Sequence, residues 1–472
     1  MREQKMRRLK ALGRLGEERV EPEDNSRARR AKTAETDGKD SKSLCNEVFS
    51  KENIERAIYS VQKNKGAPGI DGMTVFELEE WWKENGKDEE RFIRELHYRP
   101  EPVRKVKIPK PNGGERELGI PTVKDRMIQQ AVLQVISPLV DPTFSEHSYG
   151  FRPQRSAHQA IEQARKYFEE GFVAVVDIDL KSYFDTVNHD ILMRLVEEKG
   201  ITCKVVLHII RRSLMAGIMD GGLLTQRVKG TPQGGPLSPL LSNIYLDVLD
   251  KEHEARGHAF VRYADDVNIY VKSTRAGERV MQSATKFLET KLRLTVNTEK
   301  SEVGNPEKLK FLGFSLGTGA GEVYIRVHPA SVKRLKDKLR KITRRNRGIA
   351  LTCMLDELKR ALTGWINYYG ICRCKGLCGA TDIWLRRRIR QFLWRQWKTP
   401  SAKRRNLIKL GINKELAYMW SHTRKSSWRI AGTAVLHRSL TNECLSKLGL
   451  FSMQEHYMKK CEHRRTATCG TA

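Results

Sequence analysis

The chain has 472 residues, 39% of them hydrophobic, with 87 Lys and Arg against 57 Asp and Glu, a formal net charge of +30. This length and apolar content exclude a disordered chain and predict two to four domains. Apolar runs end well before about eighteen residues, and no apolar segment follows the basic first ten residues, so we expect neither a membrane span nor a signal peptide, and a cytoplasmic location.

Residues 1–49 mix basic and acidic side chains with few apolar ones, which predicts a mobile extension. A helical pattern then follows Ser50 and ends at a Gly- and Pro-rich stretch, residues 64–72. Residues 103–108 and 115–120 are predicted strands that flank a turn. Lys110 and Arg116 would project from this hairpin, where they either hold a triphosphate or are simply solvated.

Further along, residues 172–180 form a predicted strand, and the alternation of side chains puts Asp177 and Asp179 on one face of it. A buried apolar strand tolerates carboxylates poorly, so acids at its end favour a metal site. Residues 229–239 form a Gly- and Pro-rich loop before a predicted helix. Such a loop allows close backbone approach to a flat ligand.

Residues 261–271 predict a hairpin with Asp265 and Asp266 at its tip, because apolar residues alternate on the strand that follows. Adjacent carboxylates repel, and a divalent cation between them would relieve the repulsion. A solvated Asp-Asp turn is the simpler alternative.

Most of the excess charge lies in residues 331–430, which hold 27 Lys and Arg against 5 Asp and Glu. That leaves 60 against 52 for the rest of the chain, so the segment has a net charge of +22 and the remainder +8. Concentrated cations predict a polyanionic partner. Six of the eight tryptophans also lie there, as stacking platforms for bases or as helix core.

The nine cysteines are scattered, which favours free thiols over a disulfide framework. Cys372, Cys374 and Cys378 lie close together in sequence, but the second ligand pair of a zinc finger is missing, so zinc is not expected.

Taken together, these stretches resemble the reverse transcriptases, and within them the group II intron-encoded proteins that are also splicing maturases. The resemblance runs from Gly66 to about Tyr457. Its motifs are GAPGIDG at 66–72, LGIPT at 118–122, YGFRP at 149–153, QGGPLSP at 233–239, YADD at 263–266, FLGF at 311–314, GWINYY at 364–369, which is similar to the maturase X domain, and RKSSWR at 424–429.

The resemblance implies an α+β right-hand polymerase fold: fingers and palm at 50–320, a helical thumb and X domain at 321–400, and a basic C-terminal region at 401–472. It implies that Asp179, Asp265 and Asp266 bind two Mg²⁺ ions for nucleotidyl transfer. Asp179 is chosen over Asp177 because an aromatic and an Asp follow it at the spacing of the family motif. The implied nucleotide contacts are Lys110, Arg116, Leu180, Phe184, Gln233, Gly234 and Lys300.

The implied activity is RNA-directed DNA synthesis in the bacterial cytosol, together with intron binding, splicing and retrohoming. The expected partners are group II intron RNA, an RNA template with a DNA primer, dNTPs and target DNA, and no membrane. Candidate RNA contacts are Arg386, Arg387, Arg388, Arg390, Lys403, Arg404 and Arg405. No CxxC pair follows Arg429, so an HNH endonuclease domain is not expected. The alternatives are a retron or diversity-generating reverse transcriptase and an RNA-binding maturase without polymerase activity.

Overall fold

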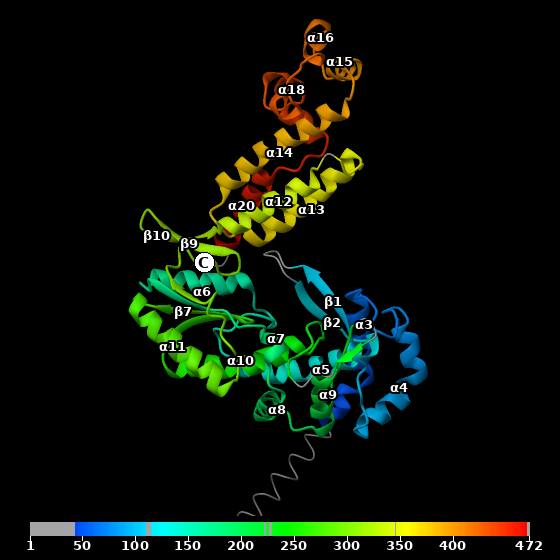
Figure 1. Cartoon of the computed structure of the whole chain (residues 1–472), viewed down its shortest axis with the longest axis vertical. Coiled ribbons are helices and arrows are strands. Elements are labelled where there is room, and N and C mark those ends of the chain that lie inside the picture. The colour runs from blue at the N-terminus through cyan, green and yellow to red at the C-terminus, as the bar shows by residue number, and fades with distance from the viewer. Residues whose placement is uncertain (1–42, 110–114, 221–222, 226–228, 345, 470–472) are drawn as a thin grey trace, which may run out of the picture. The chain divides into compact units, whose positions relative to one another are not determined.

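The computed structural model describes residues 43–109, 115–220, 223–225, 229–344 and 346–469. The chain divides into two compact units, whose helices and strands are labelled in Figure 1 where there is room. The first unit comprises Met1–Phe144 and Ser182–Tyr245, and the second comprises Ser145–Lys181 and Leu246–Ala472. Both units combine helices with sheets, which confirms the predicted α+β class.

The first unit has a four-stranded sheet in the order β2-β1-β4-β5. The sheet consists of β1 (Val103–Pro109), β2 (Glu115–Ile120), β4 (Ile218–Asp220) and β5 (Leu223–Thr225). β1 and β2 pair antiparallel, from Arg104 opposite Ile120 to Pro109 opposite Glu115, so the predicted hairpin strands are present. The helices of this unit are α3 (Lys51–Lys63), α4 (Leu78–Arg94), α5 (Val123–Val140), the 3₁₀ helix η1 (Asp141–Thr143), α7 (Tyr183–Thr186), α8 (His189–Glu198) and α9 (Lys204–Met215).

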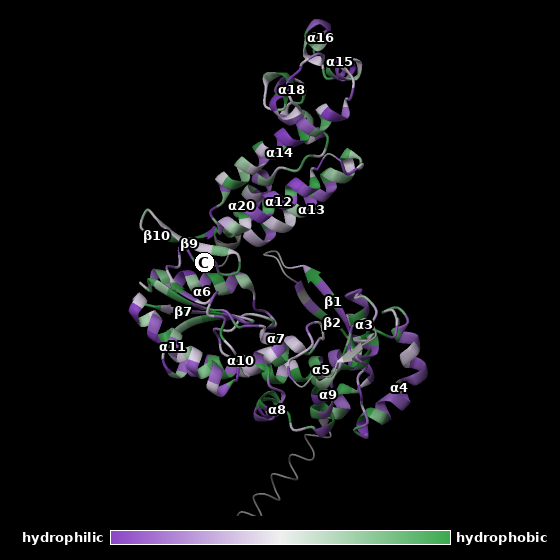
Figure 2. Cartoon of the chain, viewed as in Figure 1, coloured by the Kyte–Doolittle hydropathy of each residue, from purple (hydrophilic) through white to green (hydrophobic). Residues whose placement is uncertain are grey.

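Side-chain caps and apolar faces define these helices. Ser50 accepts a hydrogen bond from the Asn53 amide and so starts α3, and Thr122 starts α5 by accepting one from the Asp125 amide. Figure 2 shows helices that carry both hydrophobic and hydrophilic residues, as expected for helices with one buried face. Residues 43–49 do not fit the predicted mobile extension, because residues 43–48 are helical and residues 45, 48 and 49 are buried, and residues 1–42 lie outside the described residues.

The second unit contains an antiparallel sheet in the order β6-β7-β3-β8. Its strands are β3 (Ala174–Ile178), β6 (Ala259–Tyr263), β7 (Asp266–Val271) and β8 (Glu302–Gly304). α11 (Thr274–Lys291) packs on one face, where Gly277 lies against Val176. α6 (Ala157–Glu169) packs on the other face, where its Tyr167 contacts Tyr270. Val175 lies opposite Tyr270 and shares this second face with Asp177, so α6 covers only part of the face that bears the acids.

A second hairpin and a helical region follow this sheet. The hairpin is formed by β9 (Phe314–Gly319) and β10 (Glu322–Val327). The helices are α12 (Pro329–Ile342), α13 (Leu351–Tyr369), α14 (Lys375–Gln396), α15 (Pro400–Lys409), α16 (Lys414–Ser421), α17 (Ser427–Ile430), α18 (Ala434–Ser439), α19 (Asn442–Lys447) and α20 (Met453–Cys469). α10 (Ser238–Ala255) contributes residues to both units.

One hydrophobic core joins the sheet of the second unit to the helical region. At its centre the Phe314 ring lies 5.1 Å from the rings of both Tyr368 and Tyr369, and the Tyr368 hydroxyl donates to the Leu312 carbonyl. The FLGF and GWINYY stretches of the sequence therefore pack against each other. None of the helices that the structure describes is both long and apolar enough to span a bilayer.

Candidate active site

The predicted acidic hairpin is formed by β6 and β7. Tyr263 pairs with Asp266, which leaves Ala264 and Asp265 as a two-residue turn. Ala264 has a φ of +58°, in the left-handed region. Turns of this length usually place Gly, Asn or Asp at such positions. An alanine there costs about 1 kcal/mol or more, so surrounding contacts must hold the turn in place.

Asp179 directly follows β3 and is fixed by the segment that leads into β8. Its amide donates to the Ser301 hydroxyl over 3.0 Å, and its carbonyl accepts from the Asn297 amide over 2.8 Å. The Asn297 side chain donates to Asp179 Oδ2 over 2.9 Å. Lys300 Nζ lies 3.5 Å from the same oxygen. The predicted lysine is therefore a neighbour of the predicted metal ligand.

The carboxylates at this end of the sheet repel one another. Although the Asp266 side chain reaches solvent, surrounding protein atoms partly desolvate it and raise its pKa to about 6, with further contributions from the charges of Asp265 and Asp179. Burial likewise raises the pKa of Asp177 to about 7, and the negative charge of Asp266 adds to this rise. The side chain of Asp177 accepts a hydrogen bond from Asn268 on β7. The two predicted acidic stretches thus lie within electrostatic reach of each other.

This donor set matches the preference of Mg²⁺ for hard oxygen ligands, and a cation would relieve the repulsion that adds to the effect of burial on these pKa values. Among the residues that the structure describes, no three His, Cys, Asp or Glu side chains are grouped closely enough to hold a metal ion. The chemistry of the acids therefore fits Mg²⁺, while a set of side chains at ligating distance is not formed.

In the first unit, the Gly- and Pro-rich loop at 229–239, which carries Gln233 and Gly234, forms hydrogen bonds with two neighbouring elements. The Thr231 amide donates to the Phe184 carbonyl over 2.6 Å, and the Gly119 amide of β2 donates to the Gln233 carbonyl over 3.0 Å. Gly234 has a φ of +136°, and a Cβ on it would lie 2.6 Å from the Gly119 carbonyl oxygen. Only glycine fits this close approach.

Three of the predicted nucleotide-contacting elements are thus joined: the strand that carries Arg116, the Gln233–Gly234 loop, and helix α7, which carries Phe184. Arg116 lies in β2 opposite Ile108, and its side chain is not described. Lys110 lies outside the described residues. Leu180, in the second unit, is buried and forms an isolated bridge with Val296.

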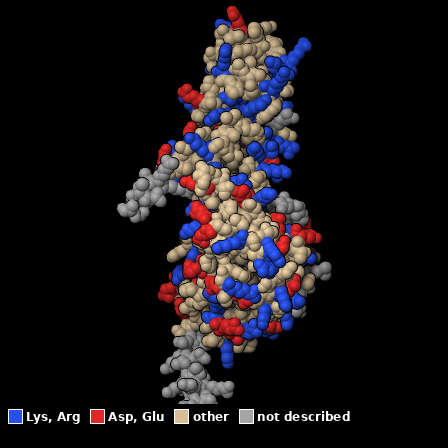
Figure 3. All heavy atoms as spheres, turned by 90° about the vertical axis from the view of Figure 1, so that its left-hand side faces the viewer, with Lys and Arg blue, Asp and Glu red and all other residues tan. Residues whose placement is uncertain are grey.

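The basic region carries its charge in two ways. Lys and Arg are prominent on the helical part of the chain in Figure 3, with few acids among them. Arg404 and Arg405 are exposed, and Lys403 Nζ lies 4.8 Å from the centre of the Trp394 ring. All three residues lie on α15, where Arg404 and Arg405 are accessible to a ligand and Lys403 is half-buried.

Several predicted RNA contacts on α14 are engaged within the protein. Arg390 is buried and donates to the Leu440 carbonyl over 2.8 Å and to the Asn442 side chain over 3.0 Å. Arg388 donates to the Thr343 hydroxyl. Arg387 donates to the Trp428 carbonyl and lies 4.1 Å from the centre of its ring, and Arg386 is half-buried. Arg390 therefore joins helices, and we remove it from the proposed RNA surface.

Sequence reasoning missed Arg262 and Asp250, both fully buried, which form an ion pair beneath the acidic hairpin. The available signal was an arginine inside an otherwise apolar strand, since a buried charge needs a partner. The cysteines agree with the sequence prediction: the eight whose side chains the structure describes are free.

Two family models match the chain in succession. One described as "Reverse transcriptase (RNA-dependent DNA polymerase)" matches residues 108–316, and one described as "Group II intron, maturase-specific domain" matches residues 332–411. Protein YkfC of Escherichia coli is 34% identical over 280 residues, which are 51% of this chain and 73% of that protein. The group II intron-encoded protein LtrA of Lactococcus lactis is 37% identical over 196 residues, which are 41% of this chain and 32% of LtrA.

Among solved structures, telomerase from Candida albicans is similar at a TM-score of 0.40 and 14% identity, over 79% of this chain and 67% of that one. The sequence matches define a reverse transcriptase, an RNA-directed DNA polymerase by class. The chain belongs to the group II intron-encoded reverse transcriptases, whose polymerase region is followed by a maturase-specific domain. That second match favours this family over the retron type.

Proposed function

We propose that the chain copies RNA into DNA by two-metal nucleotidyl transfer and also binds its group II intron RNA to assist splicing and retrohoming. The observation that carries the first part is the convergence of Asp179 with Asp265 and Asp266 at one end of a single sheet, where their charges act on one another. A structural role does not explain this, because clustered like charges destabilise a fold.

Asp179, Asp265 and Asp266 would hold two Mg²⁺ ions, which activate the primer 3′-hydroxyl and offset charge on the leaving pyrophosphate when bound. The remaining task of the protein is to position substrates and to supply compensating charge. Asn297 and Ser301 keep Asp179 in place, and the ammonium of Lys300 lies on its outer side, where it can meet a phosphate.

The joined elements of the first unit would bind the incoming nucleotide. Gln233 and Gly234 present a tight backbone surface for the flat base, and Phe184 would exclude a 2′-hydroxyl and so favour dNTPs. Lys110 and Arg116 would neutralise the triphosphate. Leu180, next to Asp179 in the second unit, is a further proposed nucleotide contact.

The cations of α15, together with Arg386, would bind the intron RNA or the DNA target. Exposed Arg404 and Arg405 support this proposal, since their side chains are accessible to phosphate. The match to the maturase-specific domain extends over residues 332–411, from α12 into the segment after α15, and supports group II intron RNA as the proposed ligand.

The test is primer extension with the full chain, an RNA template annealed to a DNA primer, dNTPs and Mg²⁺, alongside binding to a group II intron RNA. We expect cDNA synthesis that EDTA abolishes and that excess Mg²⁺ restores, and intron binding that persists in EDTA. A folded protein that binds intron RNA but extends no primer at any Mg²⁺ concentration would contradict the polymerase proposal. Extension without preference for intron RNA over an unrelated structured RNA would contradict the maturase proposal.

A further inference from the structure

A buried arginine lies directly beneath the catalytic turn. Arg262, in β6, has no exposed surface, and its guanidinium donates to both carboxylate oxygens of Asp250, at 2.6 to 2.9 Å. Its Nη1 donates to the carbonyl of Ala264 over 3.0 Å. One side chain therefore connects helix α10, which carries Asp250, to the turn that carries Asp265.

A neighbouring backbone segment supports the same turn from the side. The Arg262 amide donates to the His147 carbonyl, and the Arg262 carbonyl accepts from the Tyr149 amide, each over 2.9 Å. Gly150 follows, and a Cβ on it would lie 2.2 Å from the backbone nitrogen of Ala264. Any other residue at position 150 would push the turn away, because its Cβ would overlap the Ala264 backbone. This explains why the YGFRP stretch has a glycine at this position.

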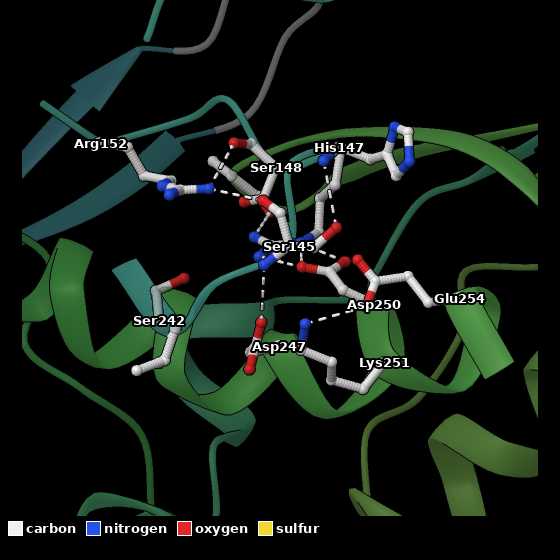
Figure 4. A network of polar contacts seen from close by, with 12 residues as sticks. Ser145, His147, Ser148, Arg152, Ser242, Asp247, Asp250, Lys251 and Glu254 are labelled. Carbon is white, nitrogen blue, oxygen red and sulfur yellow. Dashed lines mark hydrogen bonds and ion pairs between the residues drawn. The ribbon is translucent and has the colours of Figure 1, made fainter. Parts of the chain in front are cut away.

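Further hydrogen bonds hold this backbone segment, residues 145–152, in place, as Figure 4 shows. Arg152 is buried and donates to the carbonyls of Ser145 and Ser148. The Ser145 amide donates to the Asp247 carboxylate over 3.2 Å. Asp247 lies on α10, one helical turn before Asp250, so the same helix holds both the arginine and the segment beside it.

The ion pair needs an explanation other than stability. A buried ion pair is often no more stable than a well-packed apolar pair of the same volume, because both charges lose their hydration. The ion pair instead fixes the orientation of the Arg262 guanidinium. Only in the orientation that Asp250 imposes can this planar group donate to the carbonyl of Ala264. The left-handed Ala264 is a backbone conformation that depends on such external contacts.

We propose that Arg262 is a positioning residue for the catalytic turn, oriented by Asp250, and that Gly150 allows the backbone of the turn to lie as close to residues 149–150 as it does. This inference rests on the proposed polymerase function, because it assigns these residues to the placement of Asp265 and Asp266. They would act on metal affinity and catalytic rate through the turn and make no contact with substrate.

The first test replaces the ion pair while keeping the site filled. Arg262→Lys keeps the charge opposite Asp250 but loses the planar fork, and the double variant Arg262→Met with Asp250→Leu removes both charges. Arg347→Met is the matched control, because Arg347 also bonds one carboxylate, that of Glu357, and one carbonyl, that of Ile342, away from the turn.

The second test moves the turn without changing any charge. Gly150→Ala places a methyl group against the Ala264 backbone, whereas Gly376→Ala is the matched control, since a Cβ there meets nothing within 4 Å. The readouts for all variants are the Mn²⁺ dissociation constant from electron paramagnetic resonance, the Mg²⁺ concentration for half-maximal primer extension, the KM for dNTP, and the thermal midpoint.

We expect the Arg262 and Gly150 variants to fold, and to lose about ten- to a hundredfold in Mn²⁺ affinity and extension rate, the usual cost of losing an outer support of a metal ligand. The KM for dNTP should change little, and both controls should match the parent. Folded variants with the parent's Mn²⁺ affinity and Mg²⁺ dependence would overturn the inference. If the double variant fails to fold, Arg262→Lys and Gly150→Ala decide the outcome. A parent protein that extends no primer would instead contradict the proposed function, whereas Mn²⁺ binding would still test the turn.

Discussion

The acidic end of the β6-β7-β3-β8 sheet and the basic helical region use charge in opposite ways. At the sheet, like charges are brought together, and burial together with the neighbouring charges of Asp265 and Asp179 raises the pKa of Asp266 to about 6. In the helical region, the excess cations are spread over several helices, and Arg390 and Arg388 bond to carbonyl and hydroxyl groups within the protein. Only a part of that region's positive charge is therefore open to a polyanion.

The difference shows that a count of charges locates a binding region but does not identify its contact residues. A guanidinium can bridge helices as readily as it binds phosphate, because both roles use the same planar donors. A clustered carboxylate has no comparable internal use, since it is neither a donor nor a good neighbour for another acid. Acidic motifs are consequently the better guide to function in this chain.

The largest expected effect comes from removing a carboxylate at the sheet. Asp265→Asn should reduce cDNA synthesis by more than about a hundredfold, beyond the usual cost of losing an outer partner of a metal site. Intron RNA binding should remain, because the cations of α15 are unchanged. Primer extension and filter binding on the same preparation measure the two effects. Loss of both activities in a folded protein would contradict the separation of the two regions.

Next in size is the loss of an internal arginine in the helical region. Arg390→Met leaves the Leu440 carbonyl and the Asn442 side chain without their donor and should lower the free energy of unfolding by about 1 to 3 kcal/mol. Denaturant titration of the full chain measures the change, with Arg405→Met as the exposed control. An unchanged unfolding curve together with weaker RNA binding would return Arg390 to the RNA surface.

A smaller effect is expected from the exposed cations. Replacing Arg404 and Arg405 together by Gln should weaken intron binding and reduce the slope of log affinity against log salt by about 0.7 to 0.9 per lost phosphate contact. Stability should not change. Binding isotherms at several salt concentrations provide the measurement. A slope equal to that of the parent would exclude these two residues from the RNA contact.

The smallest effect concerns stability against pH without metal. The pKa of Asp177 rises from 3.8 to about 7 on folding, so the folded chain keeps a proton that the unfolded chain releases between these values. The free energy of unfolding should therefore fall as the pH rises through that window, by at most about 1.4 kcal/mol per pH unit for one proton. Asp177→Asn should flatten this slope, as measured by denaturation in EDTA. Equal slopes in both proteins would contradict the assignment.

Sequence patterns predicted the local structure of the site well. Residues 172–180 were predicted as a strand, which includes β3, and alternation predicted β7. Asp265 lies in the turn of the hairpin as expected, whereas Asp266 is the first residue of β7, opposite Tyr263. The Gly-rich loop at 229–239 was recognised, because its composition is unusual. The pairing of Arg262 with Asp250 was not, since the two residues lie on different elements, and an arginine in an apolar strand indicates that a partner is needed but not which residue it is.

The sequence by itself determined the class of protein, the order of its motifs and the identity of the acids, because these depend on residue type and local spacing. Only the tertiary structure decided which arginines are buried, that the Ala264 backbone packs directly against Gly150, and that Lys300 lies beside Asp179. The physical reason is that burial and hydrogen bonding depend on contacts between residues far apart in the chain, which no local pattern records.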